Sequence, residues 1–214
     1  MITFTDYRKA YGKTAPAVLQ IAALSLPKGI YCLRGGNGSG KTTLLRSIAG
    51  LVPFDGKILV NDLDCRRDRM AYRKAVGFSE AEPLYPGFLT GHDLIRFYQE
   101  TKGAPAGQLE DMKAALGIDL YEHSKTDTYS TGMTKKLSLM LAFTGRPEWV
   151  LLDEPFITLD AEAMVCIMAL IRQKAAEGKG ILISSHGHEM EGPDALGTTA
   201  LAIENKTLII RSHA

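Results

Sequence analysis

The sequence predicts an α/β fold with a mainly parallel sheet, a small antiparallel β layer near the N-terminus and an inserted helical lobe. Short apolar runs typical of buried strands end at Gly35, Phe78, Leu152 and Ser184. Segments of helical periodicity separate these runs, and strands that alternate with helices indicate a parallel sheet. Extended runs that precede the apolar run ending at Gly35, and a further extended run at residues 57–60, predict the β layer. Residues 91–144 are helical in pattern, which predicts the lobe.

The chain length of 214 residues suits a single domain. We expect residues 1–82 and 146–214 to form the core with its β layer, and residues 83–145 to form the helical lobe. The three cysteines are not spaced for zinc or a disulfide framework, which favours a reducing cytosol. No apolar run is long enough to cross a bilayer, and the net charge of +1 gives no indication of a nucleic-acid partner.

A glycine-rich turn lies between an apolar run and a helical pattern in the stretch LRGGNGSGKTTLL, residues 33–45. Its spacing, Gly35-x-x-x-x-Gly40-Lys41-Thr42, is that of the phosphate-binding loop. Backbone N–H groups without neighbouring Cβ atoms can approach phosphates closely, and a helix N-terminus favours an anion. We expect Lys41 to reach the β- and γ-phosphates and Thr42 to ligate Mg²⁺. The residues expected to contact nucleotide are Gly35, Gly36, Asn37, Gly38, Ser39, Gly40, Lys41, Thr42 and Thr43.

A second acidic motif, WVLLDEP at residues 149–155, follows roughly a hundred residues downstream. Its four apolar residues predict a strand buried in a parallel sheet. Asp153 at the end of that strand is expected to hold Mg²⁺ opposite Thr42. Glu154 is expected to act as the general base that polarises the attacking water. The two motifs together predict a site that hydrolyses a nucleoside triphosphate.

The segment YSTGMTKKLSL, residues 129–139, resembles the signature, usually written LSGGQ, of the nucleotide-binding subunits of ATP-binding-cassette (ABC) transporters. Taken with the two motifs, the resemblance covers nearly the whole chain, and it implies a P-loop NTPase core. It also implies that Ser130 and Gly132 contact the γ-phosphate of ATP held by a second subunit. The physics agrees, because a capped helix N-terminus is an anion site. The Tyr-Ser-x-Gly-Met form is similar to the branch that serves ABC-2-type exporters.

The resemblance assigns further residues to the ATP site. Tyr11 matches the aromatic residue that stacks on adenine, and Tyr7 is the alternative. Asp160, in FITLD, matches the acid that faces the partner subunit, although an acid at a helix N-terminus would explain it too. His186, after the run GKGILISS, matches the switch histidine near the γ-phosphate, with a catalytic role.

The sequence departs from the family pattern in two places. The family usually has a helix after the switch histidine, whereas Gly187, Gly192 and Pro193 predict a shorter or broken element here. The family also commonly has a glutamine after the strand that ends at Phe78, but SEAEPLYPG contains none. Glu82 is the expected substitute as a metal-contacting residue; Glu80 is the other acid beside Ala81, and both could instead be solvated loop charges.

The resemblance implies an ATPase with ATP and Mg²⁺ as its substrate and cofactor. Two subunits, expected to be copies of this chain, would close around two ATP molecules, and a separate membrane permease would use that motion for transport. The protein would then be cytoplasmic and peripheral to the inner face of the cell membrane.

The alternatives are a soluble ABC ATPase acting on nucleic acid or ribosomes, and a P-loop kinase or GTPase. The absence of heptads and of a basic tract speaks against the first, and Ser130 and His186, in the order that the ABC family shows, speak against the second.

Overall fold

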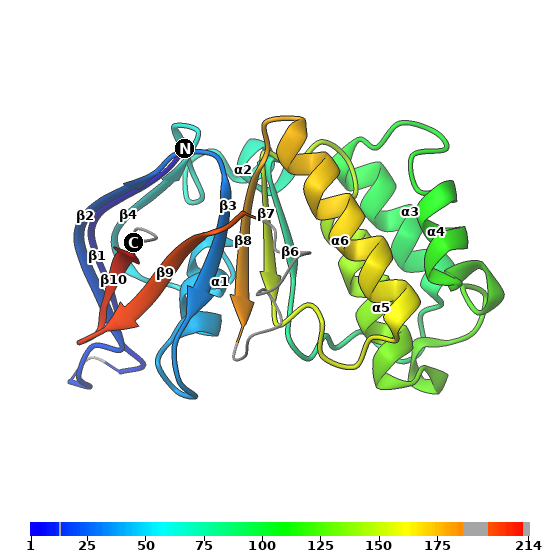
Figure 1. Ribbon diagram of the computed structural model, residues 1–214, viewed down its shortest axis with the longest axis horizontal. Helices are drawn as coiled ribbons and strands as arrows, with labels where there is room; N and C mark the ends of the chain where they lie inside the picture. The colour runs from blue at the N-terminus through cyan, green and yellow to red at the C-terminus, as the bar shows by residue number, and fades with distance from the viewer. Residues whose placement is uncertain (13, 186–196, 212–214) are drawn as a thin grey trace.

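The computed structural model describes residues 1–12, 14–185 and 197–211. It contains two sheets, and most of the helices lie on the side of the larger sheet that faces away from the smaller sheet (Figure 1). The α/β prediction is confirmed: the larger sheet is mostly parallel, a separate antiparallel sheet carries the N-terminus, and three α-helices lie between two of the larger sheet's strands in the sequence.

The antiparallel sheet has the strand order β2-β1-β4-β5, with β1 Ile2–Lys9, β2 Leu19–Leu26, β4 Asp55–Val60 and β5 Leu63–Asp64. Alternate residues of β1, including Ile2 and Phe4, are buried, as expected for a sheet with one face on the core. This alternation is interrupted after Thr5, where Asp6 has a φ of 48° and the register with β4 shifts. The interruption is a β-bulge, and it turns Tyr7 toward the core.

The larger sheet has the order β10-β9-β3-β8-β7-β6. Its strands are β3 Ile30–Arg34, β6 Val76–Ser79, β7 Trp149–Asp153, β8 Gly180–Ser185, β9 Thr199–Glu204 and β10 Thr207–Arg211. Pairs β3–β8, β3–β9, β7–β8 and β6–β7 are parallel. Every residue of β7 and β8 is buried, because both faces of a parallel sheet are covered. Strands β9 and β10 form an antiparallel hairpin that turns at Asn205 and Lys206, both with positive φ.

The helices are α1 Lys41–Ile48, α2 Arg69–Ala75, α3 Gly91–Lys102, α4 Glu110–Leu116, α5 Thr131–Ala142 and α6 Ala161–Ala176, with short 3-10 turns at Ile118–Leu120 and Thr126–Thr128. One core, which includes Leu44 and Trp149, contains residues of the antiparallel sheet, α1 and the larger sheet; a second, which includes Leu141 and Ile167, contains residues of the larger sheet and of α3 to α6. The backbones of α5 and β6 approach each other closely at Gly77, where a Cβ atom would lie 1.8 Å from the Ala142 carbonyl oxygen.

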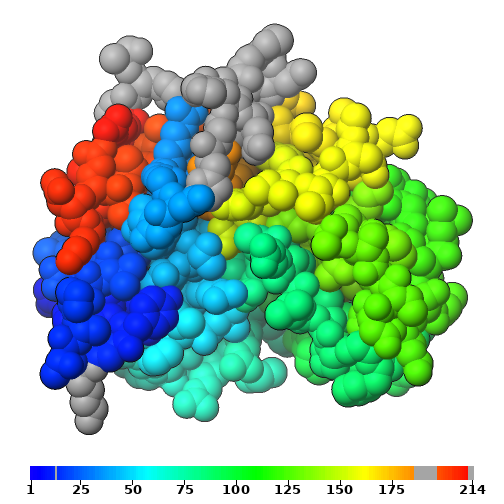
Figure 2. Space-filling view, turned by 90° about the horizontal axis from the view of Figure 1, so that it is seen from below, coloured from blue at the N-terminus to red at the C-terminus, as the bar shows by residue number. Residues whose placement is uncertain are grey.

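The carboxyl ends of β3, β7 and β8 lie at one edge of the larger sheet, the lower edge in Figure 1. Figure 2 looks onto this edge and shows the loop after β3, in light blue, between the dark-blue antiparallel layer and the green helical lobe. Ligands of open parallel sheets bind at such edges. The fold therefore brings the two predicted motifs to one place.

Candidate nucleotide-binding site

The glycine-rich turn connects the end of β3 at Arg34 to the start of α1 at Lys41. Gly38 and Gly40 have φ values of 75° and 105°, a region that glycine enters without a steric penalty. The side chain of Lys41 folds back on the turn, where its Nζ donates to the carbonyl oxygens of Gly35 at 2.7 Å and Gly36 at 3.3 Å. The turn is thus a preformed cradle with a cation at its base.

Burial governs the electrostatics of Lys41, which is only 5% exposed. Loss of water lowers the pKa of its ammonium, and the carboxylates of Glu154 and Asp153 act in the opposite direction. The ammonium of Lys41 therefore lies close enough to both carboxylates for an attractive electrostatic interaction. The P-loop and the acidic motif, distant in the sequence, form one site.

Asp153 is the last residue of β7 and is fully buried. Its Oδ1 accepts a hydrogen bond from Ser184 Oγ on β8, whereas Oδ2 has no hydrogen-bond partner among the described residues. A buried carboxylate oxygen without a partner is costly unless something else binds it. The buried hydroxyl of Ser39 in the turn is likewise without a partner in the described chain. Both atoms fit a site that receives a metal ion and phosphates.

Glu154 follows Asp153 with a φ of 46°, which is uncommon for a residue with a side chain. Its backbone N–H donates to Ser184 Oγ at 3.0 Å. Strained backbone of this kind costs about 1–3 kcal/mol and persists where its surroundings fix it. The strain is consistent with a functional position for Glu154.

A pocket of about 450 Å³ opens at this edge and is lined by Tyr11, Val18, residues 37–43 and Glu154. Its size lies within the range of small-molecule sites. Tyr11 is 66% exposed, and its hydroxyl lies 2.9 Å from Thr43 Oγ1. Tyr7 is buried and bonded to Ser47, so its ring cannot stack on a nucleotide. Between the two tyrosines, the geometry favours Tyr11.

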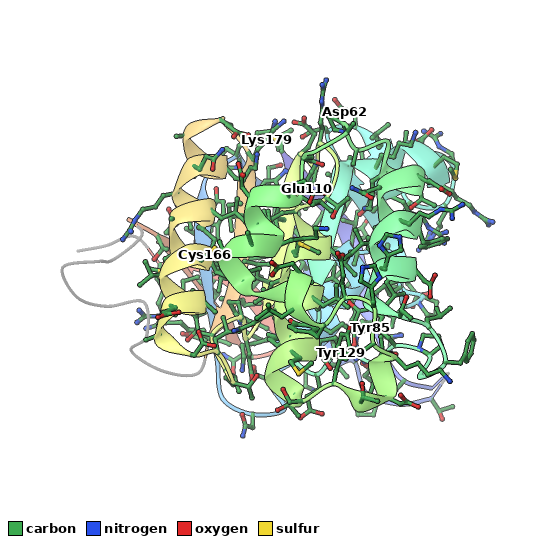
Figure 3. All side chains as sticks on the ribbon, turned by 90° about the vertical axis from the view of Figure 1, so that its right-hand side faces the viewer. Asp62, Tyr85, Glu110, Tyr129, Cys166 and Lys179 are labelled. Atoms are coloured by element: carbon green, nitrogen blue, oxygen red, sulfur yellow. The ribbon has the colours of Figure 1, made fainter. Side chains whose placement is uncertain are left out.

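Ser130 is the N-cap of α5, and its Oγ accepts from the backbone N–H of Met133 at 3.2 Å. Gly132 lies against the loop after β7, where a Cβ would be 3.0 Å from the Thr158 carbonyl oxygen. Neither residue lines the pocket beside Lys41. Tyr129, next to Ser130, and Tyr85 lie toward one end of the helical lobe, at the bottom of Figure 3. Within one chain, the signature segment and the Lys41 pocket are thus separate.

Comparison with known proteins decides the family. The model of the ABC transporter family matches residues 19–157. The chain belongs to the ABC transporter family, as an ATP-binding domain. The match begins in β2 and ends just after the Asp153–Glu154 motif, so it spans both halves of the site.

Individual relatives agree with this assignment. The chain is 30% identical to the ABC transporter ATP-binding protein YybJ of Bacillus subtilis, over 95% of this chain and 92% of that protein. It is 29% identical to the linearmycin resistance ATP-binding protein LnrL of the same organism, over 87% of this chain. A structure described as the dimeric post-hydrolysis state of the ATP-binding cassette MJ0796, bound to ADP and Pi, shares the fold with a TM-score of 0.82, 22% identity and coverage of 97% and 96% of the two chains. The chain spans 61% of the length of LnrL and 10% of that of mouse ATP-binding cassette sub-family A member 7.

Asp160 of this ABC domain is the N-cap of α6 and accepts from the Ala163 N–H at 2.8 Å. It also forms an ion pair with Lys136 of α5 at 2.6 Å, and this pair lowers the pKa of the Asp160 carboxyl. The helix-cap interpretation is therefore correct for the single chain. The Asp160 side chain remains more than half exposed, which leaves it accessible to a partner.

The loop after β6 contains both acids that the sequence offers as metal-contacting residues of this ABC domain, Glu80 and Glu82. Glu80 forms an ion pair with Arg46 of α1 at 2.8 Å, so it is not a free loop charge. Glu82 is exposed, and its side chain makes no hydrogen bond or ion pair within the described part of the chain. The loop backbone is anchored: the carbonyl oxygens of Glu80 and Ala81 accept from Lys135 at 2.6 and 3.2 Å.

His186 and the glycine- and proline-containing segment after it lie outside the described residues, so the switch role and the broken element remain predictions. Two residues of the site, Ser184 and Lys135, were not among those that the sequence patterns indicated. Ser184 could have been found as a polar residue near the end of an apolar strand. For Lys135 the signal was its position one turn before Ser138 and Leu139 on a buried helix face.

Proposed function

We propose that this ABC domain binds ATP in the pocket beside Lys41, hydrolyses it, and drives a separate membrane permease. The convergence of the Gly35–Thr43 turn with Asp153 and Glu154 at one sheet edge carries this proposal. Backbone N–H groups of the turn and the Lys41 ammonium would bind the phosphates. The ring of Tyr11, exposed at the pocket wall, would stack on adenine.

Asp153 and Thr42 would hold a magnesium ion. The buried, unpartnered Oδ2 of Asp153 supports this assignment, since a carboxylate oxygen is a preferred ligand of Mg²⁺. When bound, the ion neutralises charge that develops on the phosphates. Glu82, exposed on the loop after β6, would approach the same ion through a water molecule when the site closes around ATP.

Glu154 would act as the general base. Its carboxylate would take a proton from a water molecule that attacks the γ-phosphorus, and ADP would leave with the former bridging oxygen. Glu154 lines the pocket that contains Lys41, which supports this role. His186, the residue that follows β8 in the sequence, would support the attacking water or the γ-phosphate.

A second subunit, which we infer to be a copy of this chain, would complete each site. Ser130 and Gly132 start α5 outside the Lys41 pocket, so they would contact the γ-phosphate of ATP bound by the partner. Asp160, still exposed, would face the partner as well. The MJ0796 cassette, which shares this fold, is described as dimeric with ADP and Pi.

A permease would supply the route through the membrane. None of the helices formed by the described residues has the length and apolar character required to span a bilayer. A pocket of about 410 Å³ between α2, α3 and the segment that follows α1 is lined by the exposed side chains of Leu51, Met70 and Phe97, and Arg73 and Lys74 also line it. It would suit an amphipathic permease segment with acidic flanks, which would hold this protein at the inner face of the cell membrane. The Tyr129–Met133 variant supports an exporter of the ABC-2 type.

Phosphate release by the purified protein, with and without Mg²⁺, tests the proposed activity. Wild type should hydrolyse ATP only with Mg²⁺, and Lys41→Ala should lose both ATP binding and turnover. Lys28→Ala, a surface lysine paired with Glu148 away from the pocket, is the matched control and should behave as wild type. ATP binding unaffected by Lys41→Ala would contradict the proposed site.

A further inference from the structure

Lys135 is an almost fully buried lysine inside the helical lobe, 1% exposed, on the first turns of α5. Its Nζ donates to three backbone carbonyl oxygens: Glu80 at 2.6 Å, Ala81 at 3.2 Å and Asp153 at 2.8 Å. An ammonium group has three protons, so each finds an acceptor. The lysine therefore connects three segments of the chain: α5, the loop after β6 and the end of β7.

The peptide unit between Asp153 and Glu154 is held at both of its polar atoms. Its carbonyl oxygen accepts from Lys135, and its N–H donates to Ser184 Oγ at 3.0 Å. This unit sets the backbone of Glu154, whose φ of 46° is unfavourable for a residue with a side chain. Two hydrogen bonds from opposite sides fix a conformation that the chain would not adopt alone.

Electrostatics agree with a charged group at this position. Burial lowers the pKa of Lys135 to about 8, and the carboxylates of Asp153, Glu154 and Glu80 act to raise it. Burial of the Lys135 ammonium therefore has an unfavourable free energy, which the negative charges of these three acids partly offset. A purely apolar residue would fill the space at lower cost, which points to a role in the arrangement of the site.

We propose that Lys135 is a positioning residue for catalysis, which holds Glu154 in its reactive orientation by its bond to the Asp153 carbonyl oxygen and ties that peptide to the loop at Glu80 and Ala81. This rests on the proposed role of Glu154 as general base. The lysine supplies a connection between the backbone of this loop and the backbone of the acidic motif. Helix α5, which has Ser130 as its N-cap, thus also carries the lysine that contacts the Asp153 carbonyl oxygen.

Lys135→Met tests the proposal, because it keeps the length of the side chain and removes its donors. We expect kcat for ATP hydrolysis to fall about 10- to 100-fold, the loss typical of a displaced catalytic group. The ATP dissociation constant without Mg²⁺ should stay within about twofold of wild type, since Lys135 does not line the pocket. Lys113→Met is the matched control, because Lys113 is a largely buried lysine of the same lobe whose partners are Glu110 and Glu122. It should retain wild-type kcat.

Two further variants keep the outcome decisive. Lys135→Gln can still donate to two carbonyl oxygens and should show an intermediate kcat; it replaces Lys135→Met if that protein does not fold. In a Glu154→Gln background, Lys135→Met should cause no additional loss, because both changes act through the same group. An additional loss of equal size there, or a parallel loss of ATP affinity in the single variant, would overturn the positioning role.

The proposed function and this proposal fail in different ways. If wild type hydrolyses ATP and Glu154→Gln does not, the function stands whatever Lys135 does. Wild-type kcat in both Lys135→Met and Lys135→Gln would then overturn the positioning proposal alone. Wild-type turnover in Glu154→Gln would instead remove the role of Glu154 on which the proposal rests.

Discussion

The hydroxyl of Ser184 donates a hydrogen bond to Oδ1 of Asp153 at 2.5 Å. This bond from the neighbouring strand β8 orients the buried carboxylate and gives one of its oxygens a partner. The other oxygen has no partner among the described residues. One carboxylate thereby has a fixed orientation and a free ligand atom. Metal ligands are typically oriented by such supporting hydrogen bonds.

The Mg²⁺ requirement should depend on Glu82 more than on Glu80. Glu82 is exposed without a side-chain partner in the described structure, whereas Glu80 is paired with Arg46. Glu82→Ala should raise the Mg²⁺ concentration needed for half-maximal ATPase activity and leave metal-free ATP binding unchanged. Glu80→Ala is the comparison and should change it less. Equal, negligible shifts in a Mg²⁺ titration would leave both acids without a metal role.

The separation of Ser130 from the Lys41 pocket predicts complementation between two inactive variants. Lys41→Ala should lose ATP affinity, and Ser130→Arg should keep it but block closure by bulk and charge where the partner's ATP docks. In the proposed dimer, a mixed pair would retain one intact composite site, so part of the ATPase activity should return in the mixture. Nucleotide titrations and phosphate release of the mixture test this. Lost ATP binding in Ser130→Arg alone would argue that Ser130 acts in its own site.

Acid stability should depend on Glu148, between β7 and the preceding helix. Hydrogen bonds from Lys179 and Lys28 lower the pKa of its carboxyl from 4.5 to about 2. A depressed pKa stabilises the folded state above the unfolded value and loses that effect as the pH falls toward the folded value. The melting temperature of Glu148→Gln should therefore lie below that of wild type at pH 6, and the difference should shrink between pH 4.5 and 2. A constant difference would contradict this assignment.

The sequence predicted the fold well, because strand and helix periodicities are local. The β-bulge at Asp6 shows where local patterns fail: it turns Tyr7 inward, out of step with Ile2 and Phe4. Alternation along the strand therefore could not decide between Tyr7 and Tyr11, and only the three-dimensional placement separates them.

The sequence alone could name candidate residues for the nucleotide site because their spacing is specific, as in Gly35-x-x-x-x-Gly40-Lys41. The supporting contacts were not predictable. Lys135 meets the Asp153 carbonyl oxygen across 18 positions of the chain, and Arg46 meets Glu80 across 34. Such contacts depend on how α1 and α5 pack against the loop after β6, which no short pattern encodes.

The variant Glu154→Gln shows whether Glu154 activates water for ATP hydrolysis. The amide keeps the shape of the side chain but cannot accept the proton, so turnover should fall about 10²- to 10⁴-fold. ATP should still bind with an affinity close to that of wild type, and the unhydrolysed ATP should shift the protein toward a dimer in light scattering. Turnover at the wild-type rate, with no ATP-dependent dimer, would show that Glu154 is not the general base.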